Sequence, residues 1–355
     1  MDLPPELAAL RLGVALAELD PVARVRVVGP GVAGWIGGAL ACRTPPREAR
    51  ASPALLLRDD GRVLADALVV GEAGGALVLA EGIATAELAG RLRERARGEA
   101  TIEPLQASHA LVSLQGPFAW ELLGALAGPD VAAAPFHTAF PVRRFAALAI
   151  RAGTAGEFAY HLLVPRAHEP ALRAAIEALA ERFALRSIDR AALSLAALEQ
   201  GSFDVEHGAV RTLTPIELQL QWRIDYAAGA PGIAALRALR ASGEAGRVTW
   251  CVGPALPGVG APVRLRGRAI GTIVHAARSP ALAAVVALAL LERRFAHPGL
   301  SVTWTADGAD APARTVSPPL LACRSLFVHP YEHRFAAREA VAWPPLVRAW
   351  PPIGA

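Results

Sequence analysis

The alternation of apolar and polar positions is clearest between residues 53 and 70, where two apolar runs flank an Asp-Asp-Gly-Arg turn at residues 59–62. An Asp-Gly pair between such runs predicts a β-hairpin. Strict alternation along the second strand places Arg62, Leu64, Asp66, Leu68 and Val70 on one face. Asp66 then lies between two leucines. Burying a carboxylate there is costly without a partner, so Asp66 is either hydrogen-bonded structurally or kept for chemistry.

Similar patterns predict strands and helices along most of the first 240 residues, after a helical or loose lead-in over residues 1–19. The predicted strands are residues 23–28, 76–79, 145–151 and 157–165. The predicted helices are residues 85–97, 168–184 and 187–199, and Arg190 falls in the first turn of the last one. Residues 215–225 follow, in which Ile216, Leu218, Leu220 and Trp222 alternate with polar residues.

Two segments share one strand, Gly-Pro turn and helix pattern. The first, ending in residues 29–40, contains Gly29-x-Gly31-x-x-Gly34, the spacing of a dinucleotide-binding turn. The second, residues 111–126, keeps Gly116-Pro117 but has Phe118 and Glu121 where the later glycines would stand. The shared feature is therefore the strand-turn-helix unit, and it predicts an α+β body built from two similar halves, a pseudo-duplicated body.

From residue 246 to residue 316 the sequence changes to short apolar strands separated by Gly and Pro, which predicts a small β-barrel. The predicted domains are residues 1–105 and 106–240 for the two halves of the body, 245–318 for the barrel and 319–355 for a C-terminal extension. The extension is rich in Pro and Trp. We expect it to pack on the body or on a second subunit, because Trp343 and Trp350 are poor residues to expose.

Composition narrows the chemistry. The chain has 355 residues, of which 53% are hydrophobic and 19% charged, which is typical of a soluble protein with a large core. All 36 basic residues are arginine, which excludes lysine Schiff bases and a P-loop. The arginines are dispersed among acids, so nucleic-acid binding is not expected. The longest apolar run, residues 281–291, is too short to cross a membrane, and three dispersed cysteines favour the cytoplasm.

Three motifs resemble the glycine cleavage system T-protein, a tetrahydrofolate-dependent aminomethyltransferase, and its relatives. The most specific is GAPVRLRGRAIGTIVHAARSPALAAVVALALL at residues 260–291, which is similar to the G-x-P-V, G-x-x-I-G, S-P and A-L-A sequence of that family. PIELQLQW at residues 215–222 resembles its Pro-x-Glu-x-Gly-Leu-x-Trp segment. RAGTAGEFAYH at residues 151–161 resembles its R-T-G-Y-T-G-E-D-G-F-E loop. The resemblance covers roughly residues 20 to 318.

The resemblance implies a T-protein-like fold and a set of site residues. The family's acidic pair after the hairpin turn is Ala65-Asp66 here, so its catalytic acid is Asp66. It implies Arg190, His161, Glu157 and Thr154 as residues that bind the cofactor. The sequence departs from the family where its loop tyrosine becomes Thr154, its second loop glutamate becomes His161 and its hairpin tyrosine becomes Pro53. It also lacks the family's His-Met-Gly segment and the Lys-Gly-Cys-Tyr-x-Gly-Gln-Glu motif of related iron-sulfur assembly factors.

Residue spacing adds little to this set. Period-two spacing would place Glu157 and His161 on one strand face, toward one pocket. His329 and His333 have the i,i+4 spacing of a helical metal site, but Pro330 disturbs that helix and no third ligand is near, so no metal is expected.

The resemblance thus implies a folate-dependent one-carbon transferase that uses tetrahydrofolate or 5,10-methylenetetrahydrofolate. The donor would be a small amine or a carrier protein, and a homodimer or a larger enzyme complex is left open. The alternative is a folate-binding or scaffold subunit that keeps the fold without transfer activity, which the family tyrosines missing from this sequence favour. We expect Asp66, Arg190 and His161 to line one cavity.

Overall fold

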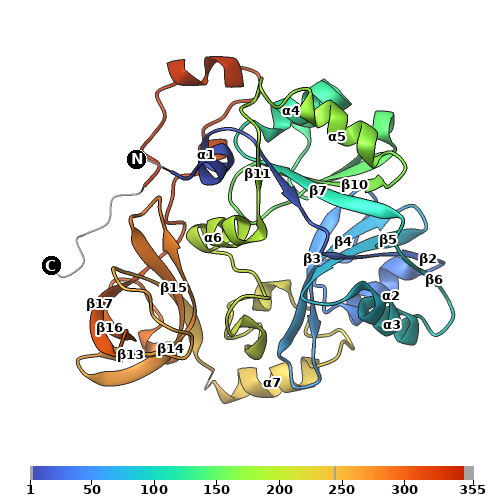
Figure 1. The fold of residues 1–355 in the computed structure, drawn as a ribbon. Coiled ribbons are helices and arrows are strands. Elements are labelled where there is room, and N and C mark those ends of the chain that lie inside the picture. The colour runs from blue at the N-terminus through green and yellow to red at the C-terminus, as the bar shows by residue number, and fades with distance from the viewer. Residues whose placement is uncertain (1–2, 244, 348–355) are drawn as a thin grey trace.

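Two β-sheets lie face to face in the body, with helices on their outer sides (Figure 1). The structure is a computed structural model that describes residues 3–243 and 245–347. The first sheet has the order β11-β1-β7-β10-β9-β8. Its strands are β1 (Ala15–Glu18), β7 (His109–Gln115), β8 (Ala139–Val142), β9 (Ala147–Arg151), β10 (Ala159–Pro165) and β11 (Arg186–Ile188).

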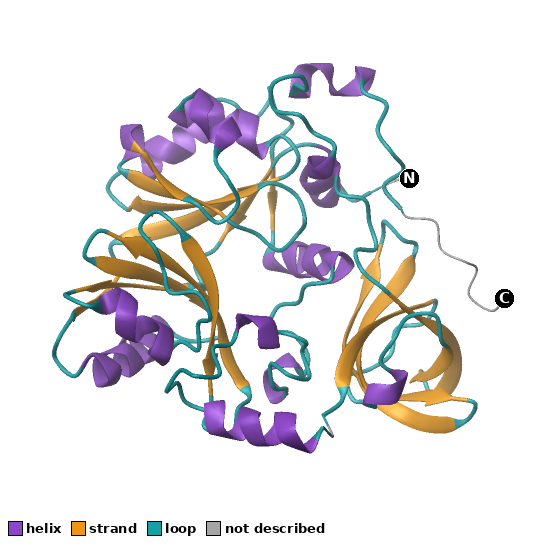
Figure 2. Cartoon of the chain, turned by 180° about the vertical axis from the view of Figure 1, so that it is seen from behind, coloured by secondary structure: helices purple, strands orange, loops and turns teal. Residues whose placement is uncertain are grey.

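The second sheet has the order β3-β4-β5-β2-β6. Its strands are β2 (Ala23–Val28), β3 (Ala51–Leu57), β4 (Val63–Glu72), β5 (Gly75–Glu81) and β6 (Thr101–Pro104). The outer face of this sheet packs against α2 (Val32–Ala39) and α3 (Thr85–Ala96), and that of the first sheet packs against α4 (Ala119–Ala127) and α5 (Glu169–Glu177). Figure 2 shows the helices on the outer sides of both sheets from behind. Each half of the body is thus a sheet with its own pair of helices.

The two Gly-Pro units occupy matching places, β2 before α2 and β7 before α4. Gly29 and Gly116 leave no room for a side chain, because a β-carbon would overlap the backbone of Glu99 in one case and of Gly13 in the other. The neighbours of β2, strands β5 and β6, both run antiparallel to it. A dinucleotide-binding unit needs a parallel crossover, so the structure does not support that interpretation of the Gly29 segment.

The third part is a closed six-stranded barrel with the order β12-β15-β14-β13-β16-β17. Its strands are β12 (Arg247–Gly253), β13 (Pro262–Leu265), β14 (Arg268–Ser279), β15 (Ala284–Leu291), β16 (Ser301–Ala306) and β17 (Ala309–Val316). Trp304 fills its interior. Between body and barrel lie α6 (Arg190–Gln200) and α7 (Ile233–Ser242), and Trp250 of β12 donates a hydrogen bond to the Leu198 carbonyl of α6 (2.9 Å). The predicted α+β body with a C-terminal barrel is confirmed.

Several predicted elements differ from the structure. Residues 186–188 form β11, which pairs with β1 in parallel, and Asp189 then caps α6 by accepting a hydrogen bond from the Ala192 N–H (2.8 Å). The helix predicted at 168–184 ends at Glu177. The alternating segment 215–225 contains turns and the short helix η4 (Gln221–Arg223). The short strands β1, β6 and β8 were not predicted, since four residues carry little pattern.

The hairpin is confirmed, but one bulge changes its faces. Leu56 pairs with Ala65 and Leu57 with Val63, so Leu64 is an extra residue in β4. Leu64 therefore packs with Ala65 in the helix-side core of the second sheet and does not share the face of Asp66, as strict alternation would have required.

The C-terminal extension returns to the first half of the chain, where it packs in one core cluster with α4. The first helix of the chain is α1 (Pro5–Leu12). Phe335 is buried against Phe118 and Phe183, and Trp343 meets Phe118 edge to face at 6.4 Å. The contact with the body expected from Trp343 is therefore present. Trp350 lies outside the described residues.

A buried charge network joins these parts. Arg11 of α1 donates to the Ala155 and Ala196 carbonyls and to Glu199 of α6 (2.7 Å), and Ser279 of the barrel donates to the other Glu199 oxygen (2.7 Å). Glu199 is 1% exposed. The charges of Arg11 and Glu199 compensate each other only when α1, α6 and the barrel are packed together, so the buried pair requires all three parts to be assembled.

Replacing Arg11 by alanine should therefore destabilise the protein by about 3–5 kcal/mol, because Glu199 is left as a buried, uncompensated charge. The measurement is thermal unfolding followed by circular dichroism. Arg91→Ala is the matched control, since Arg91 pairs with Glu87 on the exposed surface of α3 and should cost about 0.3–0.5 kcal/mol. Equal melting temperatures for the two variants would show that the Arg11 network contributes no more than a surface pair.

Candidate active site

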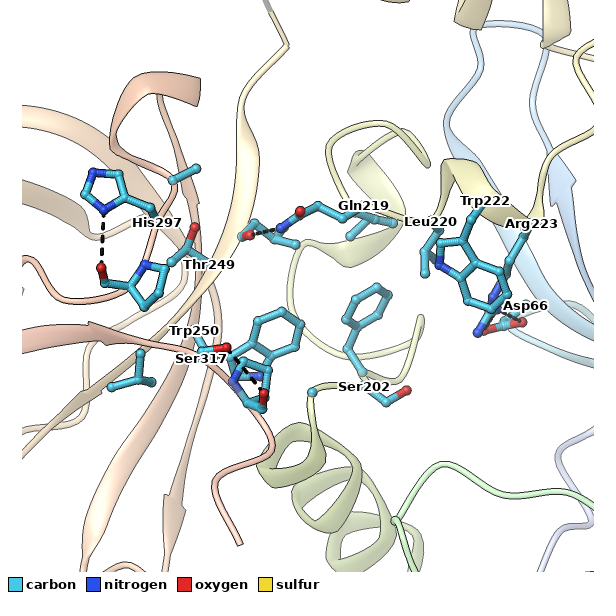
Figure 3. A pocket seen from close by; sticks show the side chains of 18 residues that line it. Asp66, Ser202, Gln219, Leu220, Trp222, Arg223, Thr249, Trp250, His297 and Ser317 are labelled. Carbon is cyan, nitrogen blue, oxygen red and sulfur yellow. Dashed lines mark hydrogen bonds and ion pairs between the residues drawn. The ribbon is translucent and has the colours of Figure 1, made fainter. Parts of the chain in front are cut away.

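A cavity of about 550 Å³ lies between the body and the barrel. The body contributes Asp66 of β4, residues 201–203 after α6, and residues 218–220, 222 and 223 around η4. The barrel side contributes residues 248–250, 296–298 and 316–318. Figure 3 shows Asp66, Arg223 and Trp222 together at one end of the cavity, with Trp250, Ser317 and His297 on the barrel side. Its size is in the range of small-molecule sites.

Asp66 is held by an arginine that sequence reasoning did not identify. Arg223 Nη1 donates to both Asp66 carboxylate oxygens at 2.9 Å. The guanidinium lies over the Trp222 ring, 5.2 Å from its centroid, and the Arg223 carbonyl accepts from the Arg43 N–H (2.9 Å). The Asp66 side chain keeps 26% of its surface accessible and Arg223 keeps 14%. Asp66 is therefore both paired and open to the cavity.

Glu81 stands directly opposite Asp66 on the neighbouring strand β5. The next pairs on the same face are Leu68 with Leu79 and Val70 with Leu77, which belong to the apolar layer between the two sheets. Opposed residues of antiparallel strands have β-carbons about 4.5–5.5 Å apart. The inter-sheet layer thus ends in a pair of adjacent carboxyl groups.

Arg190 joins this pair to a second acidic group. It lies 3.5 Å from Glu81, 3.1 Å from Asp204 and 2.9 Å from Glu206. Desolvation by the surrounding protein raises the pKa of Glu81 to about 7. The negative charges of Asp204 and Asp66 act in the same direction. Burial also opposes ionisation of Asp204, but its hydrogen bonds from Arg190 and the Glu206 N–H prevail and lower its pKa. The pKa values of Glu81 and Asp204, two of the three acids beside Arg190, are therefore shifted in opposite directions.

His161 faces the same inter-sheet layer from the first sheet. It pairs in register with Ser113 of β7, and its Nδ1 is 3.0 Å from Ser113 Oγ. Burial lowers its pKa to about 4, so the imidazole is neutral at neutral pH. Among the described residues, neither His161 nor Arg190 lines the cavity that contains Asp66. The expectation that all three line one cavity is therefore not met, although Arg190 reaches Asp66 through Glu81.

Glu157 and Thr154 occupy other surroundings. The spacing predicted that Glu157 and His161 share a strand face. That prediction is wrong, because Glu157 lies before β10 begins. Its carboxylate accepts hydrogen bonds from the Arg324 and Ser325 N–H groups and from Ser325 Oγ (2.6 Å), so the C-terminal extension engages it. Thr154 is exposed in the loop after β9.

Of the two residues that the sequence analysis missed, Glu81 could have been identified from the sequence and Arg223 could not. Glu81 follows from the two-residue turn at Ala73-Gly74, because counting back along both strands from that turn places it opposite Asp66. Arg223 directly follows the PIELQLQW motif, but its contact with Asp66 spans 157 residues of sequence, and no local pattern encodes such a pairing.

Candidate metal ligands in the extension are engaged with each other, since the His329 N–H donates to His333 Nδ1 (2.9 Å). In the described part of the chain, no group of three or more His, Cys, Asp or Glu side chains is arranged to hold a metal ion. Nor does any helix there have the length and apolar character needed to cross a membrane.

Comparison with known proteins defines the fold and the family. A two-sheet body closed by a barrel is also the fold of the crystal structure of glycine cleavage system aminomethyltransferase T from Bartonella henselae, with a TM-score of 0.78 and 21% identity over 88% of each chain. The GCVT N-terminal domain family matches residues 3–228, and the glycine cleavage T-protein C-terminal barrel domain matches residues 251–321. The chain belongs to the glycine cleavage T-protein family.

Sequence comparison agrees with this assignment. An aminomethyltransferase of Frankia alni is 27% identical over 325 residues, covering 89% of this chain and 88% of the relative. One from Saccharopolyspora erythraea is 26% identical over 329 residues, covering 88% of each. Both relatives are named as transferases, in line with the enzyme class that the motifs implied.

The raised pKa of Glu81 predicts how stability changes with pH. The pKa is about 7 in the folded protein against an ordinary value of 4.5. Between these values the folded state holds a proton that the unfolded chain has lost, so this residue makes stability fall as pH rises from about 5 to 7. Glu81→Gln cannot ionise and should melt progressively higher than the wild type over that interval. Melting curves at several pH values test this, and parallel curves for the two proteins would contradict it.

Proposed function

We propose that this protein is a tetrahydrofolate-dependent one-carbon transferase that moves a methylene or methyl unit between an amine-type donor and tetrahydrofolate. The supporting observation is Asp66, which is ion-paired and accessible in the wall of a 550 Å³ cavity in a chain of the T-protein family. The relatives that align over most of the chain are named aminomethyltransferases. The donor would be a small amine or one borne on a carrier protein, and we expect the reaction to take place in the cytoplasm.

The residues of the cavity fit a reduced folate. A pterin ring is flat and polar at its edge, so it suits a site with aromatic faces and a few fixed polar groups. Trp222, which is 53% exposed, lies in one part of the cavity wall. In the opposite part, Phe203 and Trp250 stack with their ring centroids 6.4 Å apart. Asp66 supplies a carboxylate at the Trp222 end of the cavity. Folate would contribute the nucleophilic nitrogens that accept the one-carbon unit.

The protein's own groups would then act on charge. One-carbon transfer from an amine develops positive charge at the transferred carbon, and an ionised Asp66 in a sheltered cavity stabilises that charge. Arg223 fixes the orientation of the carboxylate through two 2.9 Å contacts, so little reorganisation is needed during the reaction. Arg190 holds Asp204 and Glu81 in place behind Asp66.

The test separates binding from turnover. Wild-type protein should bind tetrahydrofolate with micromolar affinity in a calorimetric titration. Asp66→Asn should bind it nearly as well but lose a factor of about 10²–10³ in kcat in a folate-linked transfer assay, because the stabilising charge is removed at almost constant volume. Asp60→Asn, which changes an exposed acid of the hairpin turn, is the matched control.

Full activity of Asp66→Asn would assign that residue a structural role. No binding by the wild type at saturating tetrahydrofolate would refute the proposed function and favour a scaffold subunit.

A further inference from the structure

We propose that Glu81 is the proton carrier of this site and works as the neutral acid beside the ionised Asp66. The inference deepens the proposed function, on which its chemical role rests. It assigns the transfer of a proton to a residue that none of the T-protein motifs in this chain contains.

Arg190 is surrounded by more negative charge than it can compensate. One guanidinium contacts three carboxyl groups, and the longest of the three contacts is to Glu81 at 3.5 Å. Asp204 also accepts from the Glu206 N–H (2.8 Å) and contacts His207 at 3.1 Å. Arg223 donates to both oxygens of Asp66. Glu81 is therefore the carboxyl group with the least compensation for a negative charge.

The surroundings of Glu81 support the same assignment. Asp66 of β4 faces it across the strand pair, and Arg190 of α6 reaches it from the side. The segment after α6 presents Asp204, Glu206 and His207, and His275 of β14 stands behind His207 at 5.4 Å between rings. Burial and the charge of His207 lower the pKa of His275, so it adds no cation. The raised pKa of Glu81 follows first from desolvation by the surrounding protein and then from this excess of negative charge.

Glu81 is not among the residues that line the cavity, but it stands directly beside Asp66, which does line it. The β-carbons of an opposed pair are about 5 Å apart, and 41% of the Glu81 side chain is accessible. Two adjacent carboxyl groups held in opposite protonation states are the arrangement of acid and base pairs in enzymes. Arg223 is hydrogen-bonded to Asp66, while the raised pKa of Glu81 favours its protonated form.

The proton would move as follows. The donor carbon–nitrogen bond breaks with both electrons going to the departing nitrogen, which takes the proton from the Glu81 carboxyl oxygen and leaves as a neutral amine. The accepting nitrogen forms the new bond with its lone pair, becomes cationic and releases its own proton to the Glu81 carboxylate. One proton leaves Glu81 and one returns, so no oxidant or reductant is required.

Infrared difference spectroscopy of the protein without folate tests the protonation state directly. The wild type should show a protonated-carboxyl band at pH 6 that disappears with a midpoint near 7, and Glu81→Gln should lack it. Asp66→Asn should lower the midpoint, because a neighbouring negative charge is removed. Glu206→Gln, which changes another partner of Arg190, should keep the band and lower its midpoint less than Asp66→Asn does, because Glu206 raises the pKa of Glu81 less than Asp66 does. A band that persists in Glu81→Gln, or a Glu81 midpoint near the ordinary value, would overturn the proposal.

Kinetics test the chemical role. In a protein that binds folate and is active, Glu81→Gln should lower kcat by about 10²–10⁴-fold, the usual contribution of a positioned acid, with little change in KM. The wild-type rate should fall above pH 7 as Glu81 loses its proton. Unchanged kcat in Glu81→Gln would overturn the role of Glu81 and leave the proposed function standing. Absence of folate binding would refute the proposed function, whereas the infrared result reports on Glu81 independently.

Discussion

The apolar layer between the two sheets is the constraint on which the site depends. Both halves of the body contribute one sheet face to it, through residues such as Leu79 and Val70 from one half and Leu111 and Leu163 from the other. Such a layer excludes water, so any charge at its border is poorly solvated and must find protein partners. Asp66 and Glu81 stand at that border and meet this need differently, Asp66 with an arginine of its own and Glu81 with a share of Arg190.

The charged groups around this border come from segments that are far apart in the chain. Arg223 lies on η4, Arg190 begins α6, and the barrel closes the cavity from the other side. Their positions rely on the buried network of Arg11 and Glu199, which ties α1 and α6 to Ser279 of the barrel. Glu157 extends the same network to Ser325 of the C-terminal extension, where it serves assembly. A residue of the loop after β9 and the C-terminal extension are thus joined in one structural contact.

Local pattern predicted much of the fold. The hairpin around Gly61, the repeated Gly-Pro units and the six barrel strands all have periodicities or turns that depend on neighbouring residues alone. What failed were features set by tertiary contacts. The bulge at Leu64 depends on pairing with β3, and the parallel pairing of β11 with β1 decides where α6 begins. Arg223 could not be predicted because its partner is distant in sequence, whereas Glu81 was within reach of a register count.

The central claim is that the cavity between body and barrel binds a reduced folate with its reactive end at Asp66. A crystal structure of the protein with tetrahydrofolate tests this most directly. We expect the pterin ring to lie in the 550 Å³ cavity, beside Trp222 and within hydrogen-bond distance of the Asp66 carboxylate. Folate bound in the separate cavity beside β8, lined by Phe140 and Arg144, or bound with its pterin remote from Asp66, would contradict it.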